Sequence, residues 1–327
     1  MTYNNVNIEL SIIIPVYGVE KHIEQCARSL FEQSLKDNIE FIFVDDASTD
    51  HSIEILKRVI DDFPNRKKQI KIIHHNKNQG LPQARKTGIY AAKGKYVIHC
   101  DSDDWLTTQA YENLLDKAKN DNADIVICDY YDAFENINKH CHQTINQPTL
   151  LADILMRKAS GSVWNKMVKR TLYDEKIIYP TAGMGEDLVL THQLIYRAKK
   201  ISYLPEALYY YRQNPESMSR DICNHKAKKR FNELYENTEL LFSIIELEQL
   251  KLPKYVRIFR QLIAKFELNI IKGTKEGRSL FKSIYPLNPF SIIFIKEIPW
   301  IYKLLYSIVS IGLYPLYYRL KIYRRRI

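Results

Sequence analysis

The N-terminal part of the chain, as far as Tyr130, alternates between short apolar runs and amphipathic stretches, and this alternation constrains the fold more than any other feature. The apolar runs have the length of a strand and little polar alternation, which is typical of strands buried on both faces. Between them, apolar residues recur every three or four positions, as on one face of a helix. The predicted strands are Leu10–Val16, Ile39–Val44, Ile70–Ile73, Lys95–Cys100 and Asp124–Tyr130.

Alternating strands and helices are typical of βαβ units, so the sequence predicts an α/β fold with a doubly wound, mostly parallel sheet. Ligands of such sheets bind beyond the carboxyl ends of the strands. We therefore expect three polar segments that follow strands to lie at one edge of the sheet: Pro15–Tyr17, Asp45–Asp46 and Asp101–Asp104. Further along the chain we expect a loop over Asp132–Ala152 and a helix over Asp187–Ala198.

The acidic sequence DSDD at Asp101–Asp104 is the strongest local signal for a metal site. Carboxylates crowded at a strand end repel one another unless a cation neutralises them. Mg²⁺ and Mn²⁺ prefer oxygen ligands, often carboxylates together with substrate phosphates. Asp101 and Asp103 are the candidate ligands. The alternative is a solvated acidic turn that caps the next helix.

Two other acidic segments leave a similar choice open. In FVDDASTD, Asp46 is a candidate ligand-binding carboxylate, but Ser48 or Asp50 could instead cap the following helix. In GEDLVLTH, Asp187 is a candidate general base that would take a proton from a hydroxyl. Acidic residues are also common in the first turn of a helix, where they favour the helix dipole, so a purely structural role is the alternative.

Basic residues that could stabilise an anionic ligand are Arg85 and Arg212, although most arginines are surface charges. His74 and His75 follow a predicted strand, and we assign neither of them to a metal. The five cysteines show no CxxC spacing, which predicts reduced thiols rather than a disulfide framework or a zinc site.

The net charge of +10 belongs to the C-terminal part of the chain. From Lys251 onward there are 16 Lys and Arg against 3 Asp and Glu, a net charge of +13, so the first 250 residues carry −3. Many of the 23 tyrosines fall in the same part of the chain. Aromatic residues beside basic residues suit an anionic bilayer surface better than a nucleic acid groove, so we expect no nucleic acid partner.

The segment from Tyr285 to Ile327, here called the tail, is the predicted membrane-associating part. Its most apolar stretch, Ile298–Tyr318, is interrupted by Pro299, Lys303 and Pro315, which favours an interfacial segment over a spanning helix. The alternative is a helical layer packed on the rest of the protein. The N-terminal residues MTYNNVNIEL lack the pattern of a secretory leader.

Five segments occur together, in order, at the predicted strand ends: PVYGVEKHIEQCARSLFEQS, FVDDASTDHS, NQGLPQARKTGIYAAKGKYV, DSDDW and GED. In this order and context they resemble the family 2 glycosyltransferases, which have a GT-A-type fold. The resemblance covers roughly residues 9–212. It implies a catalytic domain over residues 1–215. The residue pattern after it predicts a helical extension over 216–284 and the basic tail over 285–327.

The resemblance implies a role for each matching residue. Pro15 and Tyr17, with Glu20, would line the pocket of the nucleotide base, and Asp46 would contact uracil. Asn78 and Arg85 would close over the nucleotide. Asp101, Ser102 and Asp103 match the DXD motif, in which Asp101 and Asp103 hold the metal and Asp101 and Ser102 lie near the sugar nucleotide. Asp187 matches the catalytic base, and Arg212 would contact the diphosphate.

By this resemblance the chain is an inverting hexosyl- or N-acetylhexosaminyl-transferase that uses Mn²⁺ or Mg²⁺. It would move a sugar from a UDP donor to a glycan or lipid-linked acceptor in the synthesis of a surface polysaccharide. The expected location is cytoplasmic, peripheral on the inner face of the plasma membrane, and a homo-oligomer is left open. Two alternatives are a metal-dependent nucleotidyltransferase, disfavoured because no glycine-rich phosphate loop lies near the N-terminus, and a non-catalytic membrane-surface binding protein.

Overall fold

The computed structural model describes residues 8–174, 176–213, 224–268 and 275–313. The chain divides into two compact units, Met1–Pro215 and Glu216–Ile327. The first unit contains the sheet and all the sequence motifs described above. The further division at residue 285, suggested by the sequence, stays a prediction.

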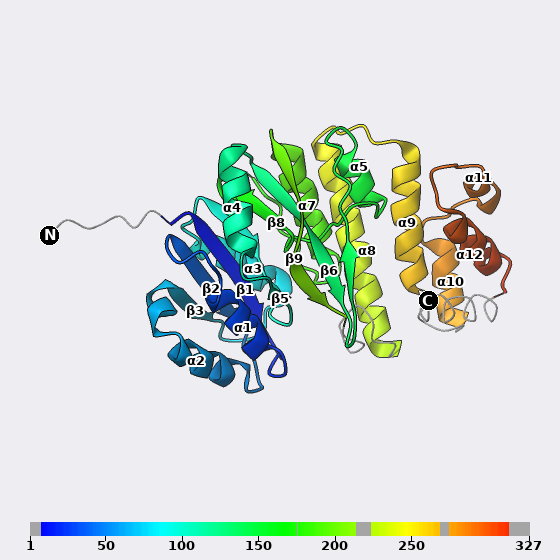
Figure 1. The fold of residues 1–327 in the computed structure, drawn as a ribbon. Helices are drawn as coiled ribbons and strands as arrows, with labels where there is room; N and C mark the ends of the chain where they lie inside the picture. The colour runs from blue at the N-terminus through cyan, green and yellow to red at the C-terminus, as the bar shows by residue number, and fades with distance from the viewer. Residues whose placement is uncertain (1–7, 175, 214–223, 269–274, 314–327) are drawn as a thin grey trace. The chain divides into compact units, whose positions relative to one another are not determined.

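A nine-stranded sheet forms the centre of the first unit, with its strands in the order β3-β2-β1-β4-β8-β6-β9-β5 and β7 paired to β6 (Figure 1). The strands β1 to β4 are parallel to one another, and β6 is parallel to β9. The strand β8 joins these two halves through antiparallel pairs with β4 and β6. In chain order the strands are β1 (Leu10–Val16), β2 (Ile39–Asp45), β3 (Ile70–His74), β4 (Tyr96–His99), β5 (Trp105–Leu106), β6 (Ile125–Ala133), β7 (Asn138–Cys141), β8 (Lys166–Lys169) and β9 (Ile201–Arg212).

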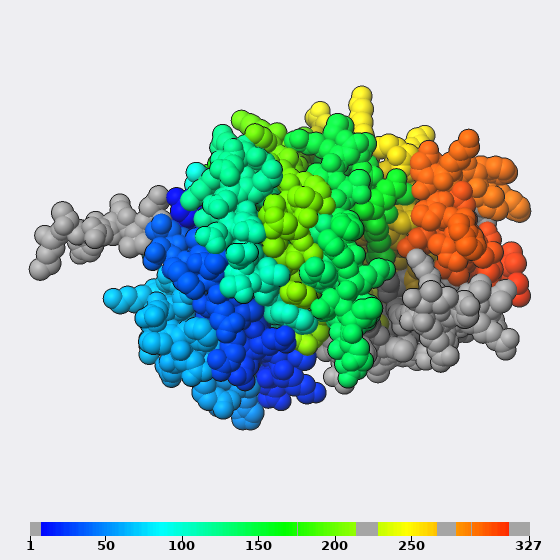
Figure 2. Space-filling model, viewed as in Figure 1, coloured from blue at the N-terminus to red at the C-terminus, as the bar shows by residue number. Residues whose placement is uncertain are grey.

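Helices cover both faces of the sheet, as a doubly wound fold requires. Successive side chains of a strand point to opposite faces. In β1, Ile12 and Ile14 join a core with α1 (Ile23–Phe31), α2 (Ser52–Asp62) and α4 (Ala110–Asn120), whereas Ile13 joins the core on the other face. That second core contains residues of α3 (Leu81–Ala91), α5 (Leu150–Leu155), α6 (Thr171–Asp174) and α7 (Glu186–Arg197). With side chains drawn, the gaps between the ribbons of this unit are filled (Figure 2).

The predicted α/β architecture is confirmed, and the strands β1 to β4 lie where the apolar runs placed them. The strands β1, β2 and β4 are buried throughout, whereas β3 is only partly buried. The predicted loop over Asp132–Ala152 is wrong, because it contains the short strand β7 and the start of α5. The sequence of β7, NKHC, is polar and largely exposed at the edge of the sheet, so it has no apolar pattern to reveal it. The cysteines Cys26, Cys100, Cys128 and Cys141 are free thiols, and Cys223 lies outside the described residues.

The second unit is helical over its described residues, with α8 (Asn224–Leu247), α9 (Lys254–Leu268), α10 (Lys275–Ser283), α11 (Pro289–Ile293), α12 (Trp300–Ser310). The Tyr302 ring of α12 packs edge-on against Phe259 of α9 with ring centroids 4.9 Å apart. The ammonium group of Lys265, also in α9, donates hydrogen bonds to the carbonyl oxygens of Phe281 and Tyr285. The described part of the tail therefore packs on the helical extension.

Within the described residues, none of the helices combines the length and the apolar character that a bilayer crossing requires. The basic end of the tail, KIYRRRI, lies outside the described residues.

Candidate active site

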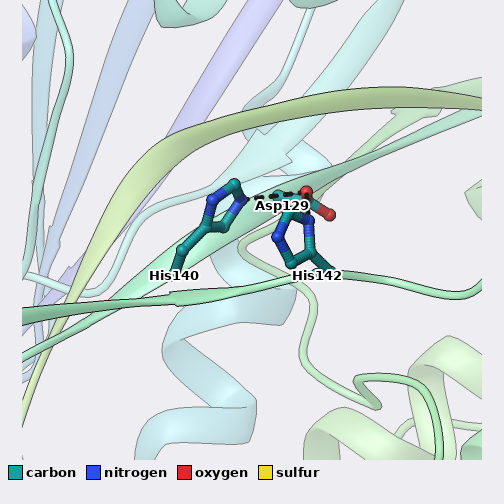
Figure 3. Close-up of side chains that lie close together, drawn as sticks. All are labelled: Asp129, His140 and His142. Carbon is teal, nitrogen blue, oxygen red and sulfur yellow. Dashed lines mark hydrogen bonds and ion pairs between the residues drawn. The ribbon is translucent and has the colours of Figure 1, made fainter.

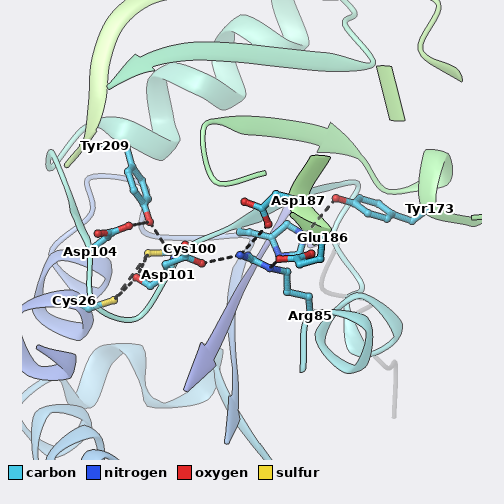
Figure 4. Close-up of polar contacts among 10 residues, drawn as sticks. Cys26, Arg85, Cys100, Asp101, Asp104, Tyr173, Glu186, Asp187 and Tyr209 are labelled. Atoms are coloured by element: carbon cyan, nitrogen blue, oxygen red, sulfur yellow. Dashed lines mark hydrogen bonds and ion pairs between the residues drawn. The ribbon is translucent and has the colours of Figure 1, made fainter. Parts of the chain in front are cut away.

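The side chain of Arg85 joins the acidic motifs that the sequence singled out (Figure 4). Arg85 lies in α3 and is only 1% exposed. Its Nε donates to Oε1 of Glu186 over 2.7 Å. Its Nη2 lies 3.0 Å from Oδ1 of Asp101 and 3.1 Å from Oδ1 of Asp187. One buried guanidinium thus holds the first Asp of the DSDD motif and both acids of the GED motif.

The fold brings these three segments together for identifiable reasons. Asp101 lies two residues after β4 ends, at the carboxyl end of the parallel strands. The helix α3 lies close against β1 because Gly88 has no side chain: a Cβ there would meet Cγ2 of Ile13 at 2.4 Å. Glu186 and Asp187 form the first turn of α7, entered through Gly185 in a left-handed conformation (φ +83°) that favours glycine.

The pKa values of the two acids of the GED motif are shifted in opposite directions. Burial raises the pKa of Glu186 well above its ordinary value, which favours its neutral form. Burial also tends to raise the pKa of Asp187, but Arg85, with Glu186, His99 and Lys166, holds it below its ordinary value. The Asp187 side chain is 26% exposed, whereas that of Glu186 is 2% exposed. Asp187 is therefore the ionised and accessible member, which is what a general base requires.

The acids of the DSDD motif fit a divalent cation. Burial raises the pKa of Asp101 to about 6, with Asp187 and Asp103 adding to the effect and Arg85 opposing it. Burial raises the pKa of Asp103 as well. Carboxylates that resist ionisation through burial and mutual repulsion are stabilised when a cation binds between them. The oxygen donors of Asp101 and Asp103 suit Mg²⁺ or Mn²⁺, as the sequence predicts.

The third acid of this motif, Asp104, has a structural role that the sequence did not reveal. It is 1% exposed, and its Oδ2 accepts from the Tyr209 hydroxyl over 2.7 Å. The same hydroxyl accepts from the backbone N–H of Asp101 over 3.0 Å. Tyr209 of β9 therefore fixes the turn on which the candidate metal ligands stand. Tyr209 is 105 residues from Asp104 along the chain, so no local pattern could have indicated the contact.

Arg212, at the end of β9, lies beside the same motif. Its backbone N–H donates to Oδ1 of Asp104 over 2.7 Å, and its Nε donates to the carbonyl oxygen of Asp103 over 2.7 Å. Its guanidinium also stacks over the Trp105 ring at 4.6 Å from the centroid, and a terminal nitrogen donates to the side chain of Gln25. Arg212 is therefore held at the metal motif, where a positive charge can meet an anionic ligand. The sequence predicted this residue but not its partners.

The residues predicted to bind the base lie at the end of β1 and in the loop that follows it, and this loop is hydrogen-bonded to the loop after β2. Pro15 is buried in β1, and Tyr17, which follows the strand, is 51% exposed. The backbone N–H groups of Gly18 and Val19 donate to Ser48 and Ser52 over 2.8 and 2.9 Å. The carboxylate of Glu20 accepts from the backbone N–H of His51 over 3.1 Å. These bonds fix the loop that follows β1 to the loop that follows β2.

Asp46 is 3% exposed and holds the segment that leads into α3. Its Oδ1 accepts from His75 over 2.7 Å and from the backbone N–H of Gln79 over 2.8 Å, and its Oδ2 accepts from the N–H of Gly80 over 2.8 Å. Asn78, in the same segment, is exposed. Asp46 directly follows β2, at the carboxyl end of the parallel strands, and its oxygens are engaged by the protein. Its contact with uracil stays a prediction.

Two buried residues behind Asp187 also escaped sequence analysis. Burial and Arg85 together lower the pKa of His99 to about 3, so this ring is neutral. Lys166 is 2% exposed, and its ammonium group donates to the carbonyl oxygens of Ser160 and Ser162 and to Oδ1 of Asn165 over 2.7–2.9 Å. Burial lowers the pKa of Lys166 to about 7, whereas Asp187 favours its charged form. Lys166 thereby fixes a loop near the candidate base.

A sequence model of the family described as "Glycosyl transferase family 2" matches residues 11–179. The "Uncharacterized glycosyltransferase EpsJ" of Bacillus subtilis is 32% identical over 226 residues, covering 64% of this chain and 62% of EpsJ. The "Minor teichoic acid biosynthesis protein GgaB" of the same organism is 28% identical over 289 residues, covering 84% of this chain but 31% of GgaB. The chain therefore spans less than two thirds of the length of these relatives.

The fold is similar to that of solved structures at lower sequence identity. The crystal structure of residues 1–349 of S. aureus TarS in complex with UDP-GlcNAc superposes with a TM-score of 0.61 at 19% identity, covering 97% of this chain and 92% of that one. The resemblance seen in the motifs, the family match over more than half of the chain and the shared fold all agree. The chain belongs to the family 2 glycosyltransferases and has a GT-A-type fold.

Proposed function

We propose that this glycosyltransferase moves a hexosyl or N-acetylhexosaminyl group from a UDP-sugar to a hydroxyl of a glycan or lipid-linked acceptor, with inversion at the anomeric carbon. The observation that carries the proposal is the Arg85 bridge, which holds Asp101 of the metal motif and the ionised Asp187 on one guanidinium. A UDP donor is supported by the complex of the structurally similar TarS with UDP-GlcNAc. A role in surface polysaccharide synthesis is supported by the relative GgaB, named for teichoic acid biosynthesis.

In this proposal Asp187 takes the proton of the acceptor hydroxyl as that oxygen attacks the anomeric carbon. A positioned general base typically contributes about 10²–10⁴-fold to the rate. Burial raises the pKa of the neighbouring Glu186, whereas the charge of Arg85 keeps Asp187 ionised. The single displacement then releases UDP from the opposite face of the sugar.

The departing diphosphate gains negative charge, and the residues of the DSDD motif are placed to meet it. Asp101 and Asp103 would hold Mn²⁺ or Mg²⁺, which supplies a Lewis acid to the diphosphate oxygens when bound. Arg212 would stabilise the same developing charge from its position against Asp103 and Trp105. Tyr17 and Glu20, on the loop after β1 that is bonded to the loop after β2, would face the base.

We further propose that the tail binds an anionic membrane surface on the cytoplasmic side, where a lipid-linked acceptor would be found. Several large apolar side chains of the tail are exposed, which suits insertion at a bilayer interface. Phe290 is 75% exposed, Phe294 is 81% exposed and Trp300 is 71% exposed. The basic sequence of the tail would add electrostatic attraction of about 1 kcal/mol for each residue at the surface.

A donor screen tests the proposed activity. The full chain would be incubated with common UDP-sugars and Mn²⁺, beginning with UDP-GlcNAc, and UDP release would be measured. We expect release with at least one donor, and loss of release in Asp103→Asn. The matched control is Asp61→Asn, because Asp61 is an exposed surface carboxylate paired with Lys67. Equal release by Asp103→Asn and Asp61→Asn would contradict the metal assignment, and no release with any UDP-sugar would contradict the donor class.

A further inference from the structure

The hairpin of β6 and β7 brings together two histidines and a buried aspartate, away from the DSDD and GED motifs along the chain (Figure 3). Both imidazole rings lie toward the Asp129 carboxylate. Nε2 of His140 and Nδ1 of His142 each lie 3.0 Å from the same oxygen, Oδ2 of Asp129. The ligand-type atoms of the three residues all lie within 4.8 Å of one another.

The strand register accounts for this arrangement. Tyr131 pairs with His140 and Tyr130 pairs with Cys141, so the next position back in β6, Asp129, lies beside His142 at the end of β7. His140 and His142 are two residues apart and therefore point to the same side of the hairpin. A β-bulge in the pairing of β6 with β9 falls at Asp129, and bulges commonly redirect a side chain.

The other oxygen of Asp129 is fully engaged, which orients the carboxylate. Its Oδ1 accepts from the Tyr203 hydroxyl over 2.8 Å and from the backbone N–H of Gln143 over 2.7 Å. Asp129 is 0% exposed, so these bonds fix Oδ2 in the direction of the two rings. Carboxylates that bind metal ions are commonly held in this way by outer hydrogen bonds, which set their direction and tune their basicity.

We propose that Asp129, His140 and His142 form a second metal site, which binds Zn²⁺ or a similar borderline cation such as Co²⁺ or Ni²⁺. Two imidazole nitrogens and one carboxylate oxygen are the donor set that suits these ions, whereas the all-oxygen donors of Asp101 and Asp103 suit Mn²⁺ and Mg²⁺. The His142 side chain is 72% exposed, so the ion can enter from solvent and its remaining positions can hold water. The inference does not depend on the proposed transferase reaction.

Metal binding would replace the two hydrogen bonds to Oδ2 of Asp129. It would also change which nitrogen of each ring carries the proton, and no other bond would be made or broken. Each ring now places a nitrogen against Oδ2; on metal binding that nitrogen gives its lone pair to the ion, and the ring proton sits on the other nitrogen. Both rings must be neutral, so protons compete with the metal and the affinity falls at acidic pH. The bound ion would also link the short edge strand β7 to the buried strand β6.

The test is a Zn²⁺ titration by calorimetry of the metal-stripped full chain without an affinity tag. The titration is done on Asp103→Asn, because this substitution removes the other candidate cation site. If Asp103→Asn does not fold, the unmodified chain is titrated instead, with saturating UDP and Mn²⁺ to occupy that site. We expect one Zn²⁺ per chain in both settings. Loss of an outer hydrogen bond typically weakens metal affinity by about 10–100-fold. We therefore expect a loss of that size in Tyr203→Phe and a larger loss in His142→Ala.

The matched control is His51→Ala, because His51 is an exposed histidine whose imidazole contacts a single carboxylate, that of Glu54. It should leave the Zn²⁺ affinity unchanged. The His142→Ala variant should keep the circular dichroism spectrum and the urea unfolding midpoint of the chain without this substitution, which shows that its fold is intact. The inference is overturned if Zn²⁺ does not bind the unmodified chain, or if His142→Ala and His140→Ala bind Zn²⁺ as tightly as His51→Ala does.

Discussion

Replacing Arg85 by Met should destabilise the first unit strongly, because this side chain is the counterion of a buried acidic cluster. Met keeps most of the apolar volume but removes every charge and donor. Asp101 and Asp187 lose the cation that lies 3.0 and 3.1 Å away, and Glu186 loses its donor at 2.7 Å. Removing one partner of a buried ion pair typically costs about 3–5 kcal/mol. With a urea m-value of about 3 kcal/mol/M, the unfolding midpoint should fall by about 1–1.7 M.

The assay is urea unfolding followed by circular dichroism, with Arg28→Met as the matched control. Arg28 also pairs with two acids, Glu24 at 2.9 Å and Asp62 at 2.7 Å, but its side chain is 38% exposed. Each exposed pair typically contributes about 0.2–1 kcal/mol, so the loss of both pairs should shift the midpoint by at most about 0.7 M. In the double variant Arg85→Met/Asp187→Asn, one stranded charge is gone. Its loss of unfolding free energy should therefore be smaller than the sum of the single losses by at least about 1 kcal/mol.

Equal midpoint shifts for Arg85→Met and Arg28→Met would refute this reasoning. Strict additivity in the double variant would also count against it, because it would mean that Arg85 and Asp187 do not interact across the short distance that the structure gives.

Three further predictions test other parts of the structure. Arg212→Gln removes the guanidinium held against Asp103 and Trp105. It should lower UDP affinity about tenfold or more, since a hydrogen bond to a charged group contributes about 1.5–3 kcal/mol. Unchanged UDP affinity in calorimetry would contradict a role for Arg212 in binding the diphosphate. Gly94→Ala should lower the free energy of unfolding by about 1–3 kcal/mol, because its Cβ would lie 2.6 Å from the backbone nitrogen of Ser11. Gly161→Ala should cost less, since there the nearest atom, at 3.0 Å, is the flexible end of Leu188, and a reversed order in urea unfolding would contradict the packing at Gly94. A chain truncated before Tyr285 should float less with anionic liposomes than the full chain, and equal flotation would exclude a membrane role for the tail.

The sequence predicts most accurately where burial leaves a pattern. The strand β1 spans the residues expected, Leu10–Val16, because a strand packed on both faces is apolar throughout. The edge strand β7 escaped prediction because its side chains are mostly exposed and polar. The same edge holds the histidines of the second proposed metal site, which sequence analysis did not single out because their strand was not predicted.

The sequence predicts which acidic motifs form the site, but it does not predict which acid of each motif has which role. Glu186 and Asp187 are adjacent, and only the packing of α7 decides that Glu186 is buried with a raised pKa while Asp187 is accessible and ionised. The contacts of Arg85 with Glu186 and of Tyr209 with Asp104 each join residues more than 100 positions apart. Such partners are set by the tertiary fold, so local residue patterns contain no sign of them.

The account depends most on Asp187 being the ionised group that accepts the acceptor's proton. The most direct measurement compares sugar transfer and UDP binding in Asp187→Asn, with the donor that the screen identifies and Mn²⁺ present. The account predicts a fall in the transfer rate of about 10²–10⁴-fold, with UDP binding close to that of the unmodified chain. Transfer at the unmodified rate by Asp187→Asn would contradict it.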